Sequence, residues 1–330
     1  MKKKTSIFQK FLNGVEIAGN ALPHPATLFG LFALTVLLIS WIGAMLGWEV
    51  QHPGTGEIIG VKNLLSVEGL HFIMLKTVTN FTSFAPLGVV LVAMLGIGVA
   101  ERSGLIAAVI RILVLAAPKK IMTFVLVFAG IISNTAADVG YVLLIPLAGI
   151  IFIAIGRHPI VGMAAAFSGV SGGFSANLAL GAIDPMLAGI SEEAAQILDP
   201  SYIVNPTANY YFLVVSTFVI SIAGTWVTER IVAPRLGDYK KPDDLEIEDV
   251  HPLSKTEKKG LLYASLVFVF FIIICIFGIV PADGFFRGEG GSVLRSPLLT
   301  GVVTLLFVVA ALAGIVYGLI VKKYKSDSDV

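Results

Sequence analysis

The sequence predicts an all-α integral membrane protein, a polytopic helical bundle that contains a re-entrant hairpin and a broken helix. Of its 330 residues, 56% are hydrophobic and only 14% are charged, whereas about a quarter of the residues in a soluble domain are charged. Apolar runs of about 20 residues, long enough to cross a bilayer, recur along the chain. Two further apolar runs, at about 121–155 and about 160–189, are interrupted by polar residues.

The first complete span is expected at about 26–47, after a basic N-terminal segment. Pro23 and Pro25 suit its start, because the first turn of a helix does not use the N–H that proline lacks. The run is too long for the apolar core of a cleavable signal peptide, so the helix is expected to be retained. The polar stretch 51–72 is expected at the membrane surface. Further spans are expected at about 85–100, 209–228, 261–280 and 298–321.

The apolar segment 104–117 is too short for a normal crossing. Its 14 residues would form a helix of about 21 Å, whereas the hydrocarbon core is about 30 Å thick. Arg111 lies in its middle. We therefore expect an interfacial or connecting helix here.

Residues 121–155 are compatible with three arrangements. These are one long helix, one broken helix, and a hairpin that enters and leaves the membrane by the same face. Lys119 and Lys120 precede the segment, and Arg157 and His158 follow it. Lys and Arg concentrate on the cytoplasmic side of membrane proteins. A hairpin places both basic clusters on that side, whereas a single crossing separates them, so the charges favour the hairpin.

The same rule orients the rest of the chain. The loop after the broken helix contains Glu192, Glu193 and Asp199 but no Lys or Arg, and is expected outside the cell. The loop 229–260 is rich in Lys and Arg and is expected to be a cytoplasmic linker, which places both termini in the cytoplasm. Arg287 and Arg295 fall in a loop expected outside and are the weakest point of this topology.

Four polar residues lie within six positions of the first interrupted run: Ser133, Asn134, Thr135 and Asp138. Polar groups at this depth are costly in hydrocarbon, and non-helical backbone is tolerated there only where protein or a water-filled cavity surrounds it. Their oxygens are suited to bind a cation or a polar substrate. The alternative is that Ser133 and Thr135 cap a helix, and that Asp138 caps the second arm rather than carrying an ion or a proton.

The second interrupted run offers a matching set. Gly172 and Gly173 allow the backbone to leave the helix, and Ser175 and Asn177 supply donors and acceptors. Asp184 precedes Pro185 and is expected at a helix break, where it binds an ion or substrate or acts as a cap. We predict that the two breaks face each other and form half of a transport site.

Other kinds of site find little support. Cys275 is the only cysteine, which excludes an internal disulfide or a cysteine metal cluster. None of the five histidines lies in a metal-binding motif, and no HExxH, CxxC or GxxxxGK is present. No metal or other cofactor is expected. The chain has no basic patch with interleaved aromatic residues, so a nucleic acid is not an expected partner.

Several specific segments extend along essentially the whole chain. They include NALPHPATLF, NFTSFAPLGVVLVAMLGIGVAERSGL, SNTAADVGYVLLIPLAGIIFIAIGRHPIVG, GFSANLALGAIDPMLAGIS and TERIVAPRLG. In these segments the chain resembles the p-aminobenzoyl-glutamate transporter family (AbgT) of the ion-transporter superfamily.

This resemblance implies two inverted repeats, each with a hairpin and a broken helix, in a homodimer of the inner membrane. It implies a substrate and ion site at the SNTAAD tip and a transport role for Asp184. The implied substrates are p-aminobenzoyl-glutamate and, for some members, sulfonamide-type antimetabolites that are moved outward. Transport would be coupled to a proton or sodium gradient, with membrane lipid as the other partner.

By this resemblance, residues 1–228 form the first transport repeat, 229–260 a linker, and 261–330 two spans that begin the second repeat. About the last third of a typical member would be missing, and with it most of the second repeat. We therefore expect that these 330 residues alone do not transport. A membrane scaffold or channel is the alternative function. An intramembrane aspartyl protease is disfavoured, because neither Asp138 nor Asp184 lies in a GxGD sequence.

Overall fold

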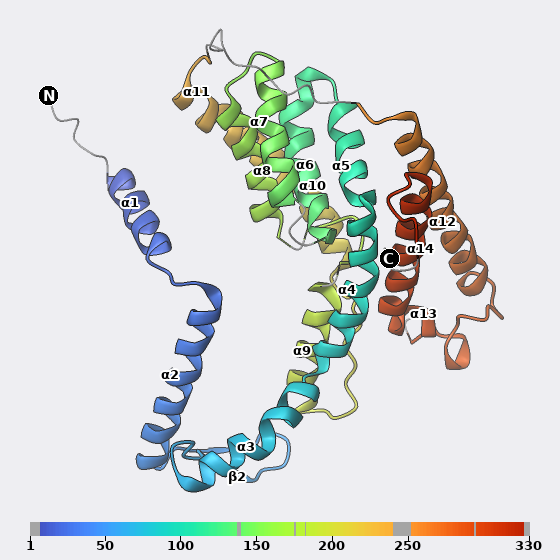
Figure 1. Cartoon of the computed structure of the whole chain (residues 1–330). Helices are drawn as coiled ribbons and strands as arrows, with labels where there is room; N and C mark the ends of the chain where they lie inside the picture. Colours follow the sequence, from blue (N-terminus) through green and yellow to red (C-terminus); the bar gives the residue numbers. More distant parts are fainter. Residues whose placement is uncertain are drawn as a thin grey trace, which may run out of the picture. The chain divides into compact units, whose positions relative to one another are not determined.

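The computed structural model describes residues 7–136, 140–174, 176–181, 183–239, 252–293 and 295–326 (Figure 1). Two compact units contain Met1–Phe84 with Ile197–Asp199, and Ala85–Gln196 with Pro200–Val330. Within the described ranges, five helices are long and apolar enough to cross a membrane: Pro25–Met45, Pro86–Ser103, Tyr210–Leu236, Lys255–Ile279 and Val302–Ile320. Each overlaps one of the expected spans, and the predicted helical membrane fold is confirmed.

The described residues of the first unit form three helices and a small sheet. Its elements are α1 (Ile7–Asn20), α2 (Pro25–Met45), β1 (Glu49–Gln51), β2 (Ile58–Gly60) and α3 (Val67–Thr82). As expected, Pro25 starts α2, where Nδ1 of His24 accepts the N–H of Ala26 at 3.3 Å. The hydroxyl of Ser40 accepts the N–H of Leu64 at 3.3 Å and ties the following loop back to α2.

The polar stretch 51–72 has regular structure that its sequence does not reveal. It contains part of an antiparallel hairpin, in which Val50 pairs with Ile59, and the start of α3. Strands of three exposed residues are too short to show a two-residue alternation. Helix α3 does carry a start signal, since the Ser66 hydroxyl accepts the N–H of Gly69 at 3.0 Å.

In the second unit, α4 (Ala85–Ser103) is followed by α5 (Leu105–Leu115), which is the connecting helix expected at 104–117. Gly104 separates them with a φ of +86°, a conformation that glycine adopts without steric cost. Helix α5 is buried on two sides. Ile110 and Val114 belong to one hydrophobic cluster, and Leu105 and Ala108 belong to another.

The segment 121–155 is a helical hairpin, as its charges predict. Its arms are α6 (Met122–Ser133) and α7 (Ile145–Ala154), with a 3-10 turn at Asn134–Ala136 and a π turn at Gly140–Leu144 between them. A 3-10 turn (Lys119–Ile121) precedes α6, and the chain bends by 110° between α5 and Lys119–Ser133. A guanidinium N–H of Arg157, beyond α7, donates to the Thr123 hydroxyl at 3.0 Å. Both ends of the hairpin therefore lie together, which excludes one long helix.

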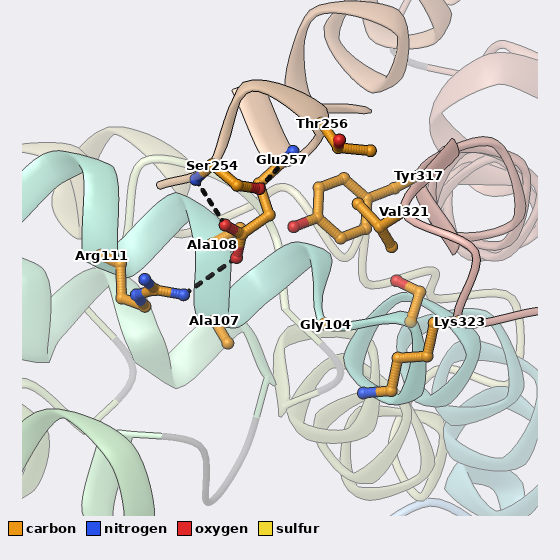
Figure 2. Close-up of a pocket in the computed structure, with 11 residues that line it drawn as sticks. Gly104, Ala107, Ala108, Arg111, Ser254, Thr256, Glu257, Tyr317, Val321 and Lys323 are labelled. Carbon is orange, nitrogen blue, oxygen red and sulfur yellow. Dashed lines mark hydrogen bonds and ion pairs between the residues drawn. The ribbon is translucent and has the colours of Figure 1, made fainter. Parts of the chain in front are cut away.

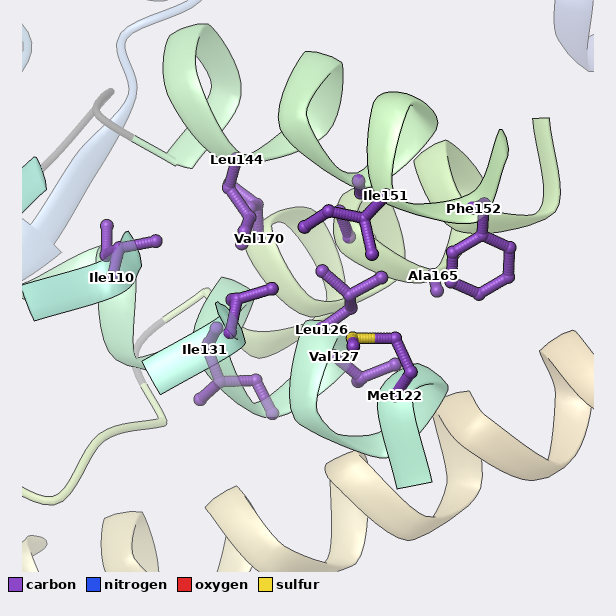
Figure 3. Packing of buried hydrophobic residues seen from close by; sticks show 14 of the residues in the cluster. Ile110, Met122, Leu126, Val127, Ile131, Leu144, Ile151, Phe152, Ala165 and Val170 are labelled. Atoms are coloured by element: carbon purple, nitrogen blue, oxygen red, sulfur yellow. The ribbon is translucent and has the colours of Figure 1, made fainter. Parts of the chain in front are cut away.

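Helix α8 (Pro159–Gly173) packs against both arms. The interface is a hydrophobic core in which Leu126 and Ile131 of α6 face Val170 of α8 and Ile151 of α7 (Figure 3). Small residues on α8 permit the close approach, because a Cβ on Gly169 would overlap the carbonyl oxygen of Val127. Packing of this kind, with small residues at the contact, is typical of helices in membranes.

The broken helix is also confirmed. Helix α8 ends at Gly173, and the chain resumes as α9 (Ile183–Gln196), which packs on α4. Helix α10 (Tyr210–Val227) then packs against α6 and α8. The expected pair of interrupted elements is therefore held in one bundle with a complete span (Figure 1).

Two helix ends lie further out than the apolar runs suggest. The helix expected at 209–228 continues through a π turn (Thr228–Val232) and α11 (Ala233–Leu236), and the span expected at 261–280 is α12 (Lys255–Ile279). Charged residues mark the limit of an apolar run but are compatible with a helix outside hydrocarbon. Ser254 and Glu257 form a capping box that starts α12. The linker 229–260 is therefore partly helical at both ends, and its acidic stretch lies outside the described residues.

The last elements are a 3-10 turn (Glu289–Gly291), α13 (Pro297–Thr300) and α14 (Val302–Ile320), and α14 packs against α4 and α12. Arg287 donates to the backbone carbonyl oxygens of Pro281, Gly291 and Val280 at 2.7, 2.8 and 3.1 Å. This arginine satisfies carbonyl groups at the end of α12, which gives it a structural role in the loop expected outside the cell.

Candidate functional site

The polar residues of the two breaks lie together. Asn177, which follows α8, is only 4% exposed, and its side-chain N–H donates to the Thr135 hydroxyl at 2.7 Å. Thr135 belongs to the turn at the end of α6. The prediction that the two breaks face each other is therefore confirmed by a direct hydrogen bond between them.

Local hydrogen bonds orient both partners. The Asn177 side-chain oxygen accepts the N–H groups of Leu178 and Ala179 at 2.8 and 3.4 Å, so its NH2 group is directed toward the hairpin. The Thr135 hydroxyl donates to the carbonyl oxygen of Ile132 at 3.0 Å. Side chains fixed in this way lose little further entropy when they bind a ligand.

Ser133 is directed into the packing of the hairpin. It is 1% exposed and donates to the carbonyl oxygen of Gly130 at 2.6 Å. A Cβ on Gly140 would overlap its hydroxyl, so the two arms meet closely beside it. Ser133 therefore fixes the start of the tip, and Thr135 and Asn177 present the polar surface.

Asp184 and Asn134 line the same small cavity. The cavity is lined by Asn134, Phe174, Asn177, Gly181, Ile183 and Asp184. Its volume is about 10 Å³. That is room for about one water molecule or one small ion. Asp184 is in the first turn of α9, and its carboxylate accepts the N–H of Gly181 at 2.7 Å. The predicted break is thus a helix start, where the carboxylate has a capping role as well as facing the cavity.

Two features of this cavity carry an energetic cost. The side-chain nitrogen of Asn134 is buried and has no hydrogen-bond partner in the described part of the chain. An unsatisfied buried donor costs about 1–3 kcal/mol. Phe174 adopts a φ of +31°, a region that residues with a side chain seldom occupy. Costs of this kind concentrate at binding sites.

An apolar cavity of about 410 Å³ adjoins the polar bridge, and Thr135 and Asn177 contribute to its wall. The rest of the wall comes from α5, α6 and the irregular segment after α8: Val109, Ile112, Leu113, Phe128, Ile132, Leu178 and Ala179. The sequence did not assign α5 to the site, because Arg111 interrupts its apolar run and marks it as a connecting helix. An apolar wall with a few polar groups is typical of small-molecule sites.

A second polar cluster holds the base of the hairpin. Arg157 and Glu229 form an ion pair at 2.8 Å, and the Thr123 hydroxyl bonds to both side chains. The Arg157 guanidinium also lies 4.7 Å from the centre of the Phe152 ring. These contacts join both arms of the hairpin to the end of α10. The charged residues at the predicted helix ends were the only sequence signal for this cluster.

The remaining predicted site residues, Asp138 and Ser175, lie outside the described residues. Within the described ranges, no group of three or more His, Cys, Asp or Glu side chains is arranged to hold a metal ion. The site therefore consists of amide, hydroxyl and carboxylate groups beside an apolar cavity.

Residues 10–330 match the model of the family described as "AbgT putative transporter family". A curated relative, the p-aminobenzoyl-glutamate transport protein of Escherichia coli (strain K12), is 34% identical over 97% of this chain and 63% of its own length. The chain thus spans less than two thirds of that relative.

Two solved structures are similar to the chain. The YdaH transporter of Alcanivorax borkumensis, reported to have an unusual topology, shares 39% identity with a TM-score of 0.77, over 93% of this chain and 64% of its own. MtrF of Neisseria gonorrhoeae, from a class of antimetabolite efflux pumps, shares 48% identity with a TM-score of 0.80. The match covers 96% of this chain and 65% of the MtrF chain. The family match covers nearly the whole chain, and this protein belongs to the AbgT transporter family.

Proposed function

We propose that the chain is a secondary active transporter, or the N-terminal part of one, for p-aminobenzoyl-glutamate or a related folate-derived or antimetabolite weak acid. The observation that carries the proposal is the hydrogen bond between Asn177 and Thr135, which joins two helix breaks beside an apolar cavity. Broken helices that meet in the bundle are the usual construction of a transport site. The names of the similar proteins support this class of substrate.

The two parts of such a substrate suit the two parts of the site. An aromatic ring fits the apolar cavity of about 410 Å³ beside Ile112 and Phe128. A carboxylate or amide is suited to the polar end at Thr135 and Asn177. Burial of the ring supplies binding free energy, and the polar groups determine its orientation.

We further propose that Asp184 takes part in ion coupling, with a proton or sodium as the coupling ion. Its carboxylate faces the small cavity, which suits about one water-sized species. Asp184 is partly buried, and a carboxylate withdrawn from water is stabilised when it holds a proton or a cation. Asn134 lines the same cavity, and its side-chain nitrogen, which has no partner among the described residues, supplies a further polar contact.

In this proposal the protein is a homodimer of the inner membrane and performs no catalysis. Lys119, Lys120 and Arg157 lie at the base of the hairpin, and an excess of Lys and Arg favours the cytoplasmic side. The two termini are then cytoplasmic, and the substrate site lies at the depth of the hairpin tip. Membrane lipid is the other partner.

The test is uptake of radiolabelled p-aminobenzoyl-glutamate by proteoliposomes that contain the protein produced from its complete gene. Proton and sodium gradients are imposed separately, and liposomes without protein are the control. The proposal predicts uptake against a concentration gradient that needs one of the two ions and stops when that gradient is dissipated.

If the substrate moves independently of both gradients and single-channel currents are recorded, the protein is a channel and not a carrier. Failure of the protein to move or bind p-aminobenzoyl-glutamate or a sulfonamide under either gradient would contradict the proposed substrate class.

A further inference from the structure

A second polar cavity of about 550 Å³ lies between α5, α12 and α14, apart from the site described above. Its wall includes Gly104, Arg111, Ser254, Glu257, Tyr317 and Lys323. In Figure 2 the Arg111 and Lys323 side chains extend toward the cavity from different elements. The proposed function gives this cavity no role.

The charge in the cavity is unbalanced. Arg111 and Glu257 form an ion pair at 3.0 Å, and the same carboxylate accepts the backbone N–H of Ser254 at 2.7 Å. Each oxygen of the Glu257 carboxylate thus has a partner. Lys323 forms no ion pair with any acidic residue in the described part of the chain. The cavity therefore contains two cationic side chains and one carboxylate.

The position of Lys323 adds to this imbalance. Its ammonium lies 3.7 Å from the point that a Cβ on Gly104 would occupy. Gly104 begins α5 and has no side chain to cap it, and the Ser103 hydroxyl accepts only the N–H of Leu105, at 3.1 Å. The start of a helix carries a partial positive charge and has unsatisfied N–H groups. An ammonium beside it is repelled, and an anion between the two would stabilise both.

An independent donor points the same way. Tyr317 is only 2% exposed, and its hydroxyl has no hydrogen-bond partner in the described residues. Figure 2 shows the hydroxyl directed into the cavity toward α5. A buried tyrosine hydroxyl normally has a partner. The Tyr317 hydroxyl opens on the cavity and is placed to donate to an acceptor of a ligand bound there.

The turn after α14 is built to hold Lys323 there. Lys322 has a φ of +60°, an unusual conformation for a residue with a side chain. Tyr324 is 4% exposed, and its hydroxyl donates to the carbonyl oxygen of Val99 at 2.8 Å. This bond ties the turn to α4 and compensates for the strained residue. The ammonium is thus positioned by the fold.

We propose that this cavity binds the phosphate group of an anionic phospholipid. A phosphate offers several acceptor oxygens, which match the Arg111 guanidinium, the Lys323 ammonium and the Tyr317 hydroxyl. The cavity lies at the start of α12 and just past the end of α14, both long enough to span. Headgroups lie where spans end, and basic pockets between such helices bind acidic lipids.

A neighbouring hollow supports a lipid rather than a small soluble anion. It has a volume of about 520 Å³, shares Thr256 with the first cavity, and is lined by Lys255, Lys259, Tyr263 and Ile320. Cationic and apolar residues thus continue from the phosphate site along α12. An amphiphilic ligand uses both, whereas inorganic phosphate uses only the first cavity.

The test measures binding to the purified protein in a phosphate-free, uncharged detergent. Short-chain phosphatidylglycerol, short-chain phosphatidylcholine and sodium phosphate are titrated separately, and the dissociation constants are measured by calorimetry. We expect phosphatidylglycerol to bind most tightly. Lys323→Gln should weaken it about tenfold, through loss of a charge-assisted hydrogen bond. Tyr317→Phe should weaken it about fivefold and keeps the buried ring.

The matched control is Lys322→Gln, which removes the same charge from the adjacent residue outside the cavity wall. It should leave the dissociation constant unchanged, and all three variants should keep the wild-type unfolding temperature. Equal loss of affinity in both lysine variants would overturn the site, since only net charge would then matter. Binding of inorganic phosphate as tightly as phosphatidylglycerol would overturn the lipid assignment. Wild-type affinity in Lys323→Gln and Tyr317→Phe would overturn the proposal entirely.

Discussion

The side-chain amide of Asn177 donates a hydrogen bond of 2.7 Å to the hydroxyl of Thr135, across 42 residues of sequence. The bond joins the tip of the α6–α7 hairpin to the irregular segment between α8 and α9. Both residues also line the apolar cavity, and Asn177 lines the small cavity that Asp184 faces. The two breaks therefore act as one structural element.

The bond between Asn177 and Thr135 should appear as an energetic coupling. Thr135→Val leaves the Asn177 amide unpaired and should destabilise the protein by about 1–3 kcal/mol. The double variant with Asn177→Leu should be less destabilised than the sum of the single variants, by about 1 kcal/mol. The comparison uses the unfolding free energies of the wild type, both single variants and the double variant. Thr225→Val is the control, since that hydroxyl donates only within α10. Strictly additive effects would contradict a functional bond between the breaks.

The close contact of α6 and α8 leads to a second prediction. Gly169→Ala places a Cβ against the carbonyl oxygen of Val127 and should destabilise the protein by about 1–3 kcal/mol. Gly172→Ala, three residues along α8, meets no atom within 4 Å. It should be neutral or stabilise by up to about 1 kcal/mol, because alanine is the better helix former. The unfolding temperatures of the pair decide this, and equal losses would show that the helices are not so closely packed.

The outline of the fold was accessible from the sequence because the bilayer restricts what an apolar run can become. The five complete spans and both interrupted runs follow from length and polarity. The doubling back of 121–155 followed from Lys119, Lys120 and Arg157, and the bond from Arg157 to Thr123 bears it out. The short strands around Val50 and Ile59 were not predicted, since three exposed residues show no alternation of apolar and polar side chains.

The site was predictable in part. Thr135, Asn177 and Asp184 stood out because polar groups are costly in hydrocarbon, and the structure brings them to one place. The direction of each side chain was not accessible, and Ser133 is turned into the hairpin. The contribution of Ile112 from α5 depends on a 110° bend that no local pattern specifies.

The base of the hairpin should depend on the Arg157–Glu229 pair. Both side chains are about a third exposed, at 31% and 38%, so solvent screening limits the pair to about 1 kcal/mol. Arg157→Met and Glu229→Gln should each lower the unfolding free energy by roughly this amount, with little further loss in the double variant. Hydrogen exchange in the first turn of α6 should rise in parallel. Arg235→Met, an exposed change on α11, serves as the control.

Filling the apolar cavity should impair substrate binding more than folding. Ile112→Trp adds bulk to the wall of the cavity of about 410 Å³. It should raise the KM for p-aminobenzoyl-glutamate uptake about tenfold, a change typical of an altered apolar pocket, and leave the unfolding temperature near the wild-type value. Val215→Trp, on an exposed face of α10, controls for the added indole. Equal KM values in the two variants would show that the aromatic ring of the substrate does not bind in this cavity.

If the joined breaks form a transport site in which Asp184 carries charge, Asp184→Asn should abolish transport. Asparagine retains an oxygen that accepts the N–H of Gly181, so the start of α9 should stay folded and only the charge is lost. Uptake is measured in proteoliposomes beside Asp283→Asn, a change in an exposed loop. We expect background uptake and a wild-type unfolding temperature for Asp184→Asn, and full uptake for Asp283→Asn. Full ion-coupled uptake by Asp184→Asn would show that the Asp184 charge has no part in transport.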